Sequence, residues 1–382
     1  MRILSPFVAE VVVSNPLKTC AIAEAKVKTD KVDAFVLAQL LRCDFLPCVW
    51  EPPAEIQQLR RLTARRAVLV MDATAIKNRL HAVIRQRLLH CPVADLFCNE
   101  GRQWLTTLEI DAEGRSALDS DLRLLAQVET ELSRQDTVLA QHAYSDDRVK
   151  LLMTLPGVNY TVAQTVLAAL GEIARFQDGA HAASYLGLVP RTHQSANHCY
   201  HGPITKQGNR QARAMLVQAA QHVASHPGPL GAFFRRLAQR KDRNIAVVAT
   251  ARKLVMIAWQ MLTHNEPYRY AQPHTVDFKF TRLRSKVVGK RERRKVCKSL
   301  PPGVSPQRGQ RIYQVPALAT VYEEAGLPKL TNTALLPHGE QQMLARGHFL
   351  DFMKEINTPK QKVWKRSTKK NSSNTQTQMK ST

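Results

Sequence analysis

The chain has 382 residues and is strongly basic, with 55 lysines and arginines against 31 aspartates and glutamates and a formal net charge of +24. This charge would draw the protein to polyphosphate, which favours a nucleic-acid partner but carries no sequence specificity. No run of eighteen apolar residues offers a membrane span, and the N-terminus lacks the apolar core of a signal peptide. The seven cysteines are scattered without a Cys-x-x-Cys pair, so we expect free thiols in a reducing cytoplasm.

The N-terminal segment is expected to hold a short apolar strand over residues 7–13, followed by a turn and then a helix that begins near Asp30. Asp30 and Asp33 lie three residues apart at the start of that helix, so they project from one face. Such a pair can hold a divalent metal ion. The same two acids also suit an N-cap and a first helical turn, where the helix dipole favours negative charge. The residues by themselves leave both interpretations open.

From Pro52 and Pro53 onward the pattern becomes helical for a long stretch. Apolar residues then recur in alternating three- and four-residue steps, as in a heptad seam; they are Leu59, Leu62, Leu69, Ala73, Ile76, Leu80 and Val83. A second helix is expected over about 116–142, and the two together predict a long antiparallel pair. The basic residues that decorate the first helix suit either a solvated face or a stripe that contacts nucleic acid.

A compact helical domain is expected from about residue 151, where Pro156 ends one helix and Gly157 supplies the permissive turn before the next. This pattern is typical of a helix-hairpin-helix, whose second helix offers free N–H groups to a phosphate. Asn159 stands where the pattern often has a second glycine, and asparagine tolerates a left-handed conformation. A plain helical turn in a core is the alternative. Further helices are expected over about 207–224 and 244–263.

After Tyr270 the composition changes. The basic residues from Arg282 to Lys298 stand against Glu292 alone, a density that repels itself unless phosphate neutralises it. We expect poor order in this run without a nucleic acid. A short helix is expected over 316–322, and the composition from Pro359 to the C-terminus is typical of disorder.

Three stretches, taken in their order and separations, carry a resemblance to a known family. They are Asn15-Pro16 through Ala38, Leu155–Val158 followed by Phe176 and Tyr185–Pro190, and Ser195 followed by Gly202–Asn209 and Arg213. Over roughly residues 1–265 the chain resembles the IS110 family of bacterial insertion-sequence transposases. These enzymes join a RuvC-like domain to a helical domain that carries a serine. The resemblance implies DNA recombination, with DNA and a structured guide RNA as partners.

In that family four carboxylates hold Mg²⁺ in the order Asp, Glu, Asp and Asp, and Asp30 and Asp33 match the last two. The resemblance implies that the first two belong to strands that would precede Met1. We therefore expect an N-terminally truncated or mis-started member that keeps only a remnant of the RuvC-like, RNase H-like domain. The resemblance also implies that the helical pair is a coiled coil that mediates dimer contacts, so we expect a homo-oligomer.

Ser195 matches the family's nucleophile, and we expect it in a loop between Pro190 and Gly202. Positive side chains nearby would stabilise the charge that develops on phosphate; the candidates are Lys206, Arg210 and Arg213. Ala196 stands where the family usually has a glycine. The full set of residues expected to contact nucleic acid is Gly157, Asn159, Lys206, Gly208, Asn209, Arg210 and Arg213.

His193 and His198 flank Ser195 and could suggest a metal site. The pattern places neither a carboxylate nor a cysteine set beside them, so we interpret both as hydrogen-bonding or solvated histidines.

The whole sequence predicts a mostly α protein in four parts. These are the RuvC-like remnant over 1–50, the coiled-coil arm over 51–147, a helical serine domain over 148–268, and a basic, largely disordered tail over 269–382. The function that the resemblance implies is that of an Mg²⁺-dependent, RNA-guided transposase with Ser195, Asp30 and Asp33 as catalytic residues, and we expect its activity to be impaired by the missing N-terminal residues. A catalytically inactive remnant that still binds nucleic acid is the competing hypothesis.

Overall fold

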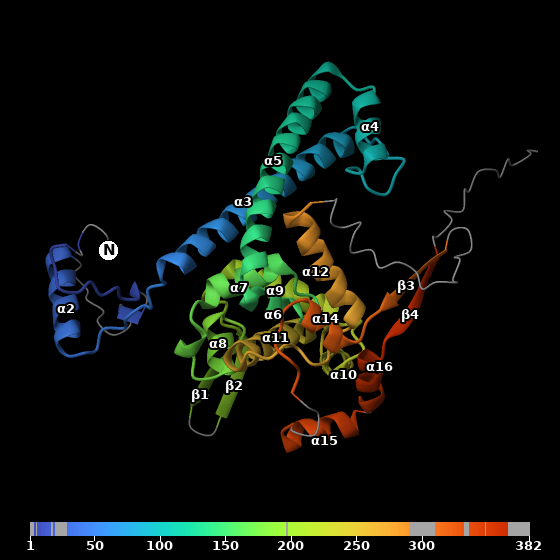
Figure 1. Ribbon diagram of the computed structural model, residues 1–382. Helices are drawn as coiled ribbons and strands as arrows, with labels where there is room; N and C mark the ends of the chain where they lie inside the picture. The colour runs from blue at the N-terminus through green and yellow to red at the C-terminus, as the bar shows by residue number, and fades with distance from the viewer. Residues whose placement is uncertain are drawn as a thin grey trace, which may run out of the picture. The chain divides into compact units, whose positions relative to one another are not determined.

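The computed structural model describes residues 4, 6–16, 18–19, 29–195, 198–289, 310–331, 336–347 and 349–365, with 310–314 and 361–365 described by backbone only. The chain forms two compact units, Met1–Gln58 and Leu59–Thr382. Within the described ranges it is predominantly helical, as expected, and its sheets are two antiparallel pairs of strands (Figure 1).

The N-terminal unit contains helix α2 (Asp30–Arg42), which begins where the sequence predicted a helix. Its N-cap is Thr29, whose hydroxyl accepts the Val32 N–H at 3.3 Å, so Asp30 is a first-turn residue rather than the cap itself. Asp33 lies in the same first turn. Both acids are exposed, and the helix dipole accounts for their position without a metal ion.

The strand expected over 7–13 is not formed in the described part of that segment, and this prediction is wrong there. Residues 6–13 form turns and irregular backbone, and Phe7 is 82% exposed. Ser14 makes an isolated antiparallel bridge with Cys48, beside a 2.8 Å hydrogen bond from the Val49 N–H to the Val13 carbonyl. An apolar strand needs neighbouring strands to bury its face, and the described residues supply no sheet here.

The arm consists of two long helices, α3 (Ala54–Gln86) and α5 (Ala112–Ser145), joined through a short helix α4 (Asn99–Thr107) (Figure 1). The long helices run antiparallel, because their ion pairs join Arg66 to Asp136, Arg79 to Asp121, and Arg87 to Asp111. The predicted apolar seam lies between them: Ile76 and Leu80 of α3 share a core with Leu118 and Leu125 of α5.

This packing bears on the expected dimer contact. Leu69 and Ile76 are only 6% and 5% exposed, and Leu80 is fully buried within the single chain. The seam is therefore occupied by intrachain contacts. A second copy that docks on the arm must use other side chains, so the seam itself is not a free dimerisation surface.

Asp136 connects the arm to the C-terminal part of the chain. Its carboxylate accepts a hydrogen bond from Arg66 at 2.6 Å and one from Lys286 of α12 (Pro273–Val287) at 3.0 Å. Burial alone would raise the pKa of Asp136, but the hydrogen bonds from Arg66 and Lys286 outweigh it and hold the pKa below its usual value. The charged carboxylate thus holds three helices together.

The main core is built by α6 (Asp147–Met153), α7 (Tyr160–Leu170), α8 (Gly179–Tyr185), α9 (Arg210–Val223), α10 (Pro229–Ala238) and α11 (Arg243–His264), with a short 3₁₀ turn at Ile173–Arg175. Helix α11 lies at its centre and contacts α6, α8, α9 and α10. By length and composition α11 is the one helix of the described residues that could cross a membrane. Its buried face instead packs into this core.

The C-terminal region differs from the disordered tail that the composition predicted. Its described part forms α12, α14 (Leu318–Glu324), α15 (His338–Arg346) and α16 (Leu350–Asn357), with strands β3 (Gln310–Val315) and β4 (Lys360–Lys365) paired antiparallel. Tyr322 is 1% exposed and donates its hydroxyl to the Tyr268 carbonyl at 2.6 Å. The prediction of disorder is therefore wrong for these residues, whereas 290–309 and 366–382 lie outside the described ranges.

Candidate active site around Ser195

Ser195 lies at the end of a β-hairpin rather than in an irregular loop. Strand β1 (Pro190–Ser195) pairs antiparallel with β2 (His198–Ile204), and an irregularity in register falls between Pro190 and Thr192. The sequence did not reveal these strands, because their exposed residues are polar on both faces and so lack the apolar alternation of a half-buried strand. Residues 196 and 197, between the two strands in sequence, lie outside the described residues and match none of the usual hairpin-turn dipeptides.

The register decides which side chains share a face of the hairpin. Ser195 lies directly opposite His198, and His193 lies opposite Tyr200. Because side chains alternate along a strand, these four residues project from one face of the pair. All four are exposed. The structure therefore brings two imidazoles and a phenol to the face that carries the serine hydroxyl, a grouping that the linear sequence obscures.

The opposite face carries a second small network. Thr192 Oγ1 and His201 Nδ1 are 3.1 Å apart, and His201 Nε2 is 3.8 Å from Cys199 Sγ. These contacts hold the His201 ring and leave the serine face to His193 and His198. Sequence reasoning missed His201, since its partner Thr192 is near it only through the strand pairing.

Two glycines anchor the base of the hairpin against the start of α9. Gly187 and Gly208 both have left-handed backbones, with φ of +69° and +75°. A β-carbon on Gly187 would lie 2.3 Å from the Gln207 carbonyl oxygen, and one on Gly208 would lie 2.1 Å from the Tyr185 carbonyl oxygen. The close approach leaves no room for a side chain at either position, so Gly208 is required by packing and conformation.

Asn209 and Arg213 complete this base. Asn209 caps α9 by accepting the Ala212 N–H at 2.9 Å. Arg213 Nη1 donates to the carbonyls of Leu186 and Gln207, each at 2.9 Å. Burial, with a contribution from nearby Arg210, lowers the pKa of Arg213 from its usual value. Both side chains are thus used inside the protein, where they position the hairpin.

Lys206 and Arg210 differ from Arg213 in being exposed beside the hairpin base. The backbone of Lys206 is left-handed, with φ of +55°, and its N–H donates to the Gly187 carbonyl at 3.2 Å. That turn fixes the direction in which the lysine leaves the chain. Of the cations expected to meet phosphate, these two are the ones whose charged groups remain accessible.

Gly157 and Asn159 also have structural partners. Gly157 has φ of +75°, and a β-carbon there would lie 2.3 Å from the Ala219 carbonyl oxygen of α9. Asn159 is the N-cap of α7 and accepts the Val162 N–H at 2.9 Å, with an extended φ of −102° rather than a left-handed one. The left-handed backbone that the sequence suggested for Asn159 is therefore wrong, and asparagine is favoured at this position because it caps the helix. The turn packs against α9, as a core turn would.

The two aspartates belong to the other unit of the chain, Met1–Gln58. Among the described residues, no group of three or more His, Cys, Asp or Glu side chains is arranged to hold a metal ion. Mg²⁺ takes an octahedral set of oxygen ligands, and two carboxylates from one helical turn do not provide it. Asp30 and Asp33 fit a magnesium site only as part of a larger set of carboxylates.

Comparison with known families finds a match for each of the two regions, the one with the aspartates and the one with the serine hairpin. A model described as transposase IS116/IS110/IS902 family matches residues 149–235, which include the hairpin, Lys206 and Arg213. A second model, described as a transposase, matches residues 3–88, which include Asp30 and Asp33.

Curated relatives agree. The transposase for insertion sequence element IS1111A of Coxiella burnetii is 28% identical over 254 residues, which cover 63% of this chain and 68% of the relative. A probable family 20 transposase of Pseudomonas aeruginosa is 30% identical over 149 residues, 38% of this chain and 44% of the relative. A pilin gene-inverting protein of Moraxella bovis is 27% identical over 266 residues, 68% and 74% of the two chains.

The two family matches fall in the order that the sequence motifs predicted, one over the aspartates and one over the serine hairpin. The two family models and the curated relatives together support an IS110-family transposase, which is a DNA-recombining enzyme.

Proposed function

We propose that this transposase recombines DNA through the Ser195 hydroxyl, which attacks a backbone phosphorus and becomes joined to it. The observation that carries the proposal is the hairpin itself. It presents Ser195 on an exposed face, with His198 directly across the strand pair and a rigid base made by Gly208 and Arg213. An exposed nucleophile on a fixed support suits a large substrate such as DNA.

A serine hydroxyl needs a base to become a good nucleophile. We propose that a neutral imidazole on the serine face, His198 first and His193 second, accepts the hydroxyl proton. As the proton leaves, the Oγ–phosphorus bond forms, and the bond from phosphorus to the leaving strand oxygen breaks. That oxygen then takes a proton. Exposed Lys206 and Arg210 would face the phosphate charge that develops.

We also propose that Asp30 and Asp33 contribute to a magnesium site. Asp30 and Asp33 would serve as two members of a carboxylate set, and the described residues supply no further members beside them. A divalent ion bound by a complete set would polarise phosphate oxygens. No step of the serine chemistry above is assigned to it.

DNA and a structured guide RNA are the proposed partners, and the protein would act in the bacterial cytoplasm as a homo-oligomer. Support comes from the net charge of +24, from the family resemblance, and from the exposed cations beside the hairpin. In this scheme the RNA would carry the target sequence by base pairing, so the protein would need to read only backbone and shape.

The test is a covalent trap. The protein is incubated with Mg²⁺, the element's non-coding RNA and a DNA of the element's ends, nicked so that the leaving strand diffuses away. Wild type is expected to form a denaturant-resistant protein–DNA adduct, and Ser195→Ala to form none. Ser184→Ala is the matched control, because Ser184 is an exposed serine of α8 outside the hairpin.

His198→Gln is expected to slow adduct formation by roughly 10²–10⁴-fold while DNA affinity is unchanged. The exposed His222 of α9 gives the control substitution His222→Gln. An adduct that persists in Ser195→Ala would remove the serine from its role.

The incomplete carboxylate set favours one other candidate, a nucleic-acid-binding protein without catalytic activity. The same trap separates the two functions. Salt-sensitive binding of DNA and RNA without any adduct in the presence of Mg²⁺ and RNA would assign the chain to that second function.

A further inference from the structure

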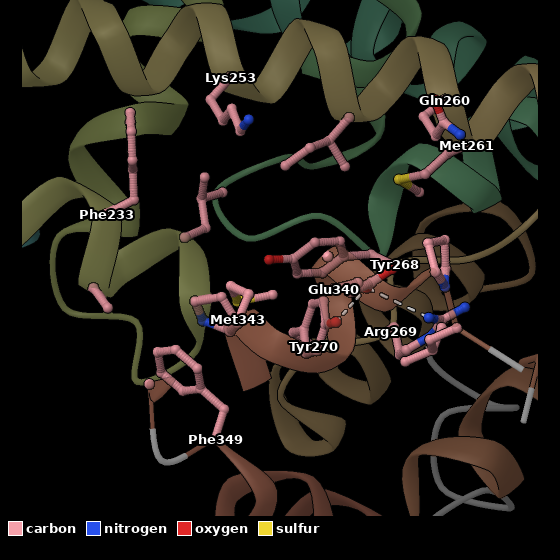
Figure 2. Close-up of a pocket in the computed structure, with 18 of the residues that line it drawn as sticks. Phe233, Lys253, Gln260, Met261, Tyr268, Arg269, Tyr270, Glu340, Met343 and Phe349 are labelled. Carbon is pink, nitrogen blue, oxygen red and sulfur yellow. Dashed lines mark hydrogen bonds and ion pairs between the residues drawn. The ribbon is translucent and has the colours of Figure 1, made fainter. Parts of the chain in front are cut away.

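A large cavity lies away from the serine hairpin, between α10, α11 and the segments that follow α11. It has a volume of about 1200 Å³. Its walls come from Phe233 of α10, Lys253 and Met261 of α11, and Met343 of α15, with Phe349 after α15 (Figure 2). Most of these residues lie beyond the 149–235 stretch of the family match.

A tyrosine hydroxyl faces the cavity. Tyr268 is one of the lining residues and is only 6% exposed. In Figure 2 the hydroxyl points into the open space below Lys253. The hydroxyl of the neighbouring Tyr270 donates to Glu340. A buried hydroxyl aimed into an open cavity is a ready contact for a polar ligand atom.

The charges around the cavity are unbalanced. Its acids, Glu266 and Glu340, are both engaged by the buried guanidinium of Arg269. Three exposed cations on its rim have no ion pair with any acid in the described ranges; they are Arg236, Lys253 and Arg346. The rim therefore carries uncompensated positive charge, which calls for an anionic ligand.

The walls of the cavity are largely aromatic and apolar, which favours a ligand with flat apolar groups. Phe233, Tyr268 and Phe349 reach the cavity from three different segments, and Met261 and Met343 supply further apolar surface. The volume of about 1200 Å³ leaves room for more than one flat group. The ligand should thus combine flat apolar groups with regularly spaced anionic groups.

We propose that this cavity binds unpaired nucleotides of a DNA or RNA strand. Their bases lie against the phenylalanine rings with a polar edge toward the Tyr268 hydroxyl, and their phosphates face the rim cations. Duplex nucleotides do not fit, because their bases are already stacked and paired inside the helix. The contact is separate from the Ser195 hairpin and operates whether or not that serine is a nucleophile.

The test measures binding of the full-length chain to fluorescent single strands, one of DNA and one of RNA with the same unstructured sequence, and to the matching DNA duplex. Phe233→Leu and Phe349→Leu keep apolar volume but remove the flat ring. Each is expected to weaken single-strand binding about tenfold, as loss of one stacked base does, with the salt dependence unchanged. Phe278→Leu is the control, since Phe278 is a 57% exposed phenylalanine of α12 outside the cavity.

The combined substitution of Arg236, Lys253 and Arg346 by Gln tests the rim. It is expected to reduce the slope of log K against log salt by about 2 for single strands, at roughly 0.7 per phosphate contact. The phenylalanine variants also distinguish DNA from RNA. The strand that loses more affinity in these variants is the one that the cavity binds.

Three results would overturn the proposal. One is single-strand affinity in Phe233→Leu and Phe349→Leu within twofold of wild type. Another is an equal loss of duplex and single-strand binding, which would indicate a general surface effect. The third is full competition by a polyglutamate peptide, which would assign the cavity to an acidic protein segment. Because the assay measures binding alone, its outcome is independent of the adduct test for Ser195.

Discussion

Single residues in this protein are constrained mainly by the backbone that they approach. Gly157, Gly187 and Gly208 each combine a left-handed φ with a carbonyl oxygen where a β-carbon would lie. Arg213 likewise donates to two carbonyls at the hairpin base, and Asn209 caps α9. The structure therefore gives each of these motif residues a structural role.

Gly157 gives the sharpest test at this scale. Gly157→Ala is expected to lower the free energy of unfolding by roughly 2–5 kcal/mol, because left-handed strain adds to the clash with the Ala219 carbonyl. Gly326→Ala is the control: its φ is +72°, but nothing lies within 4 Å, so only strain of about 1–2 kcal/mol is expected. Urea unfolding measures both. Equal losses would show that the close approach is relieved at little cost.

His226 links stability to pH. Its Nδ1 accepts the Gly228 N–H at 3.1 Å, which requires the neutral ring, and burial, aided by Lys279 and Arg235, lowers the pKa of His226 to about 4. The unfolded chain, with a pKa near 6.5, binds the proton more readily. Stability is therefore full above pH 6.5 and falls as the pH drops toward 4.

His226→Asn keeps a hydrogen-bond acceptor but cannot titrate. Between pH 7.5 and pH 4.5 the wild type is expected to lose about 2.5 kcal/mol relative to this variant, measured as the difference in unfolding free energy at each pH. A difference that stays constant across this range would contradict the lowered pKa.

At the scale of elements, the arm is held by one apolar seam within the chain. Leu80 of α3 and Leu125 of α5 are fully buried, whereas the ion pairs along the arm are partly exposed and contribute little each. The heptad pattern correctly predicted that Ala73, Ile76 and Leu80 lie in this seam, but Ile84 rather than Val83 continues it. The pattern did not distinguish an intrachain from an interchain partner, because both present the same apolar face.

Leu80→Ala is expected to cost roughly 2–5 kcal/mol of stability, since it leaves a cavity between the helices. Leu124→Ala changes a 43% exposed leucine on the facing helix and should stay within about 0.5 kcal/mol. Thermal and denaturant unfolding at two protein concentrations measure both variants. If the effect of Leu80→Ala depends on concentration, the seam joins two chains after all.

At the scale of the whole molecule, the net charge of +24 predicts that binding to nucleic acid depends strongly on salt. The basic run that contains Lys290, Arg291, Arg293, Arg294, Lys295 and Lys298 lies outside the described residues, next to the end of α12. Replacing these six by Gln is expected to lower the slope of log K against log salt for duplex DNA by up to about 5. Filter binding between 50 and 300 mM salt measures the slope. An unchanged slope would show that the run makes no phosphate contacts.

The sequence by itself predicted several long helices and the resemblance to the family. Long stretches with a regular apolar period predicted α3, α5, α9 and α11, because burying one face of a helix demands that period. The positions of Asp30 and Ser195 within family motifs predicted two candidate sites. These inferences are reliable because each rests on neighbours along the chain.

Tertiary structure decided what depends on residues distant in sequence. The polar strands of the serine hairpin carry no apolar alternation, so only their mutual hydrogen bonds reveal that His198 opposes Ser195. The C-terminal helices are too short to be stable on their own. They form because residues such as Leu318, Val321 and Tyr322 are buried in the core built by the earlier helices. The nucleotide cavity exists for the same reason, since its walls come from segments that meet only after folding.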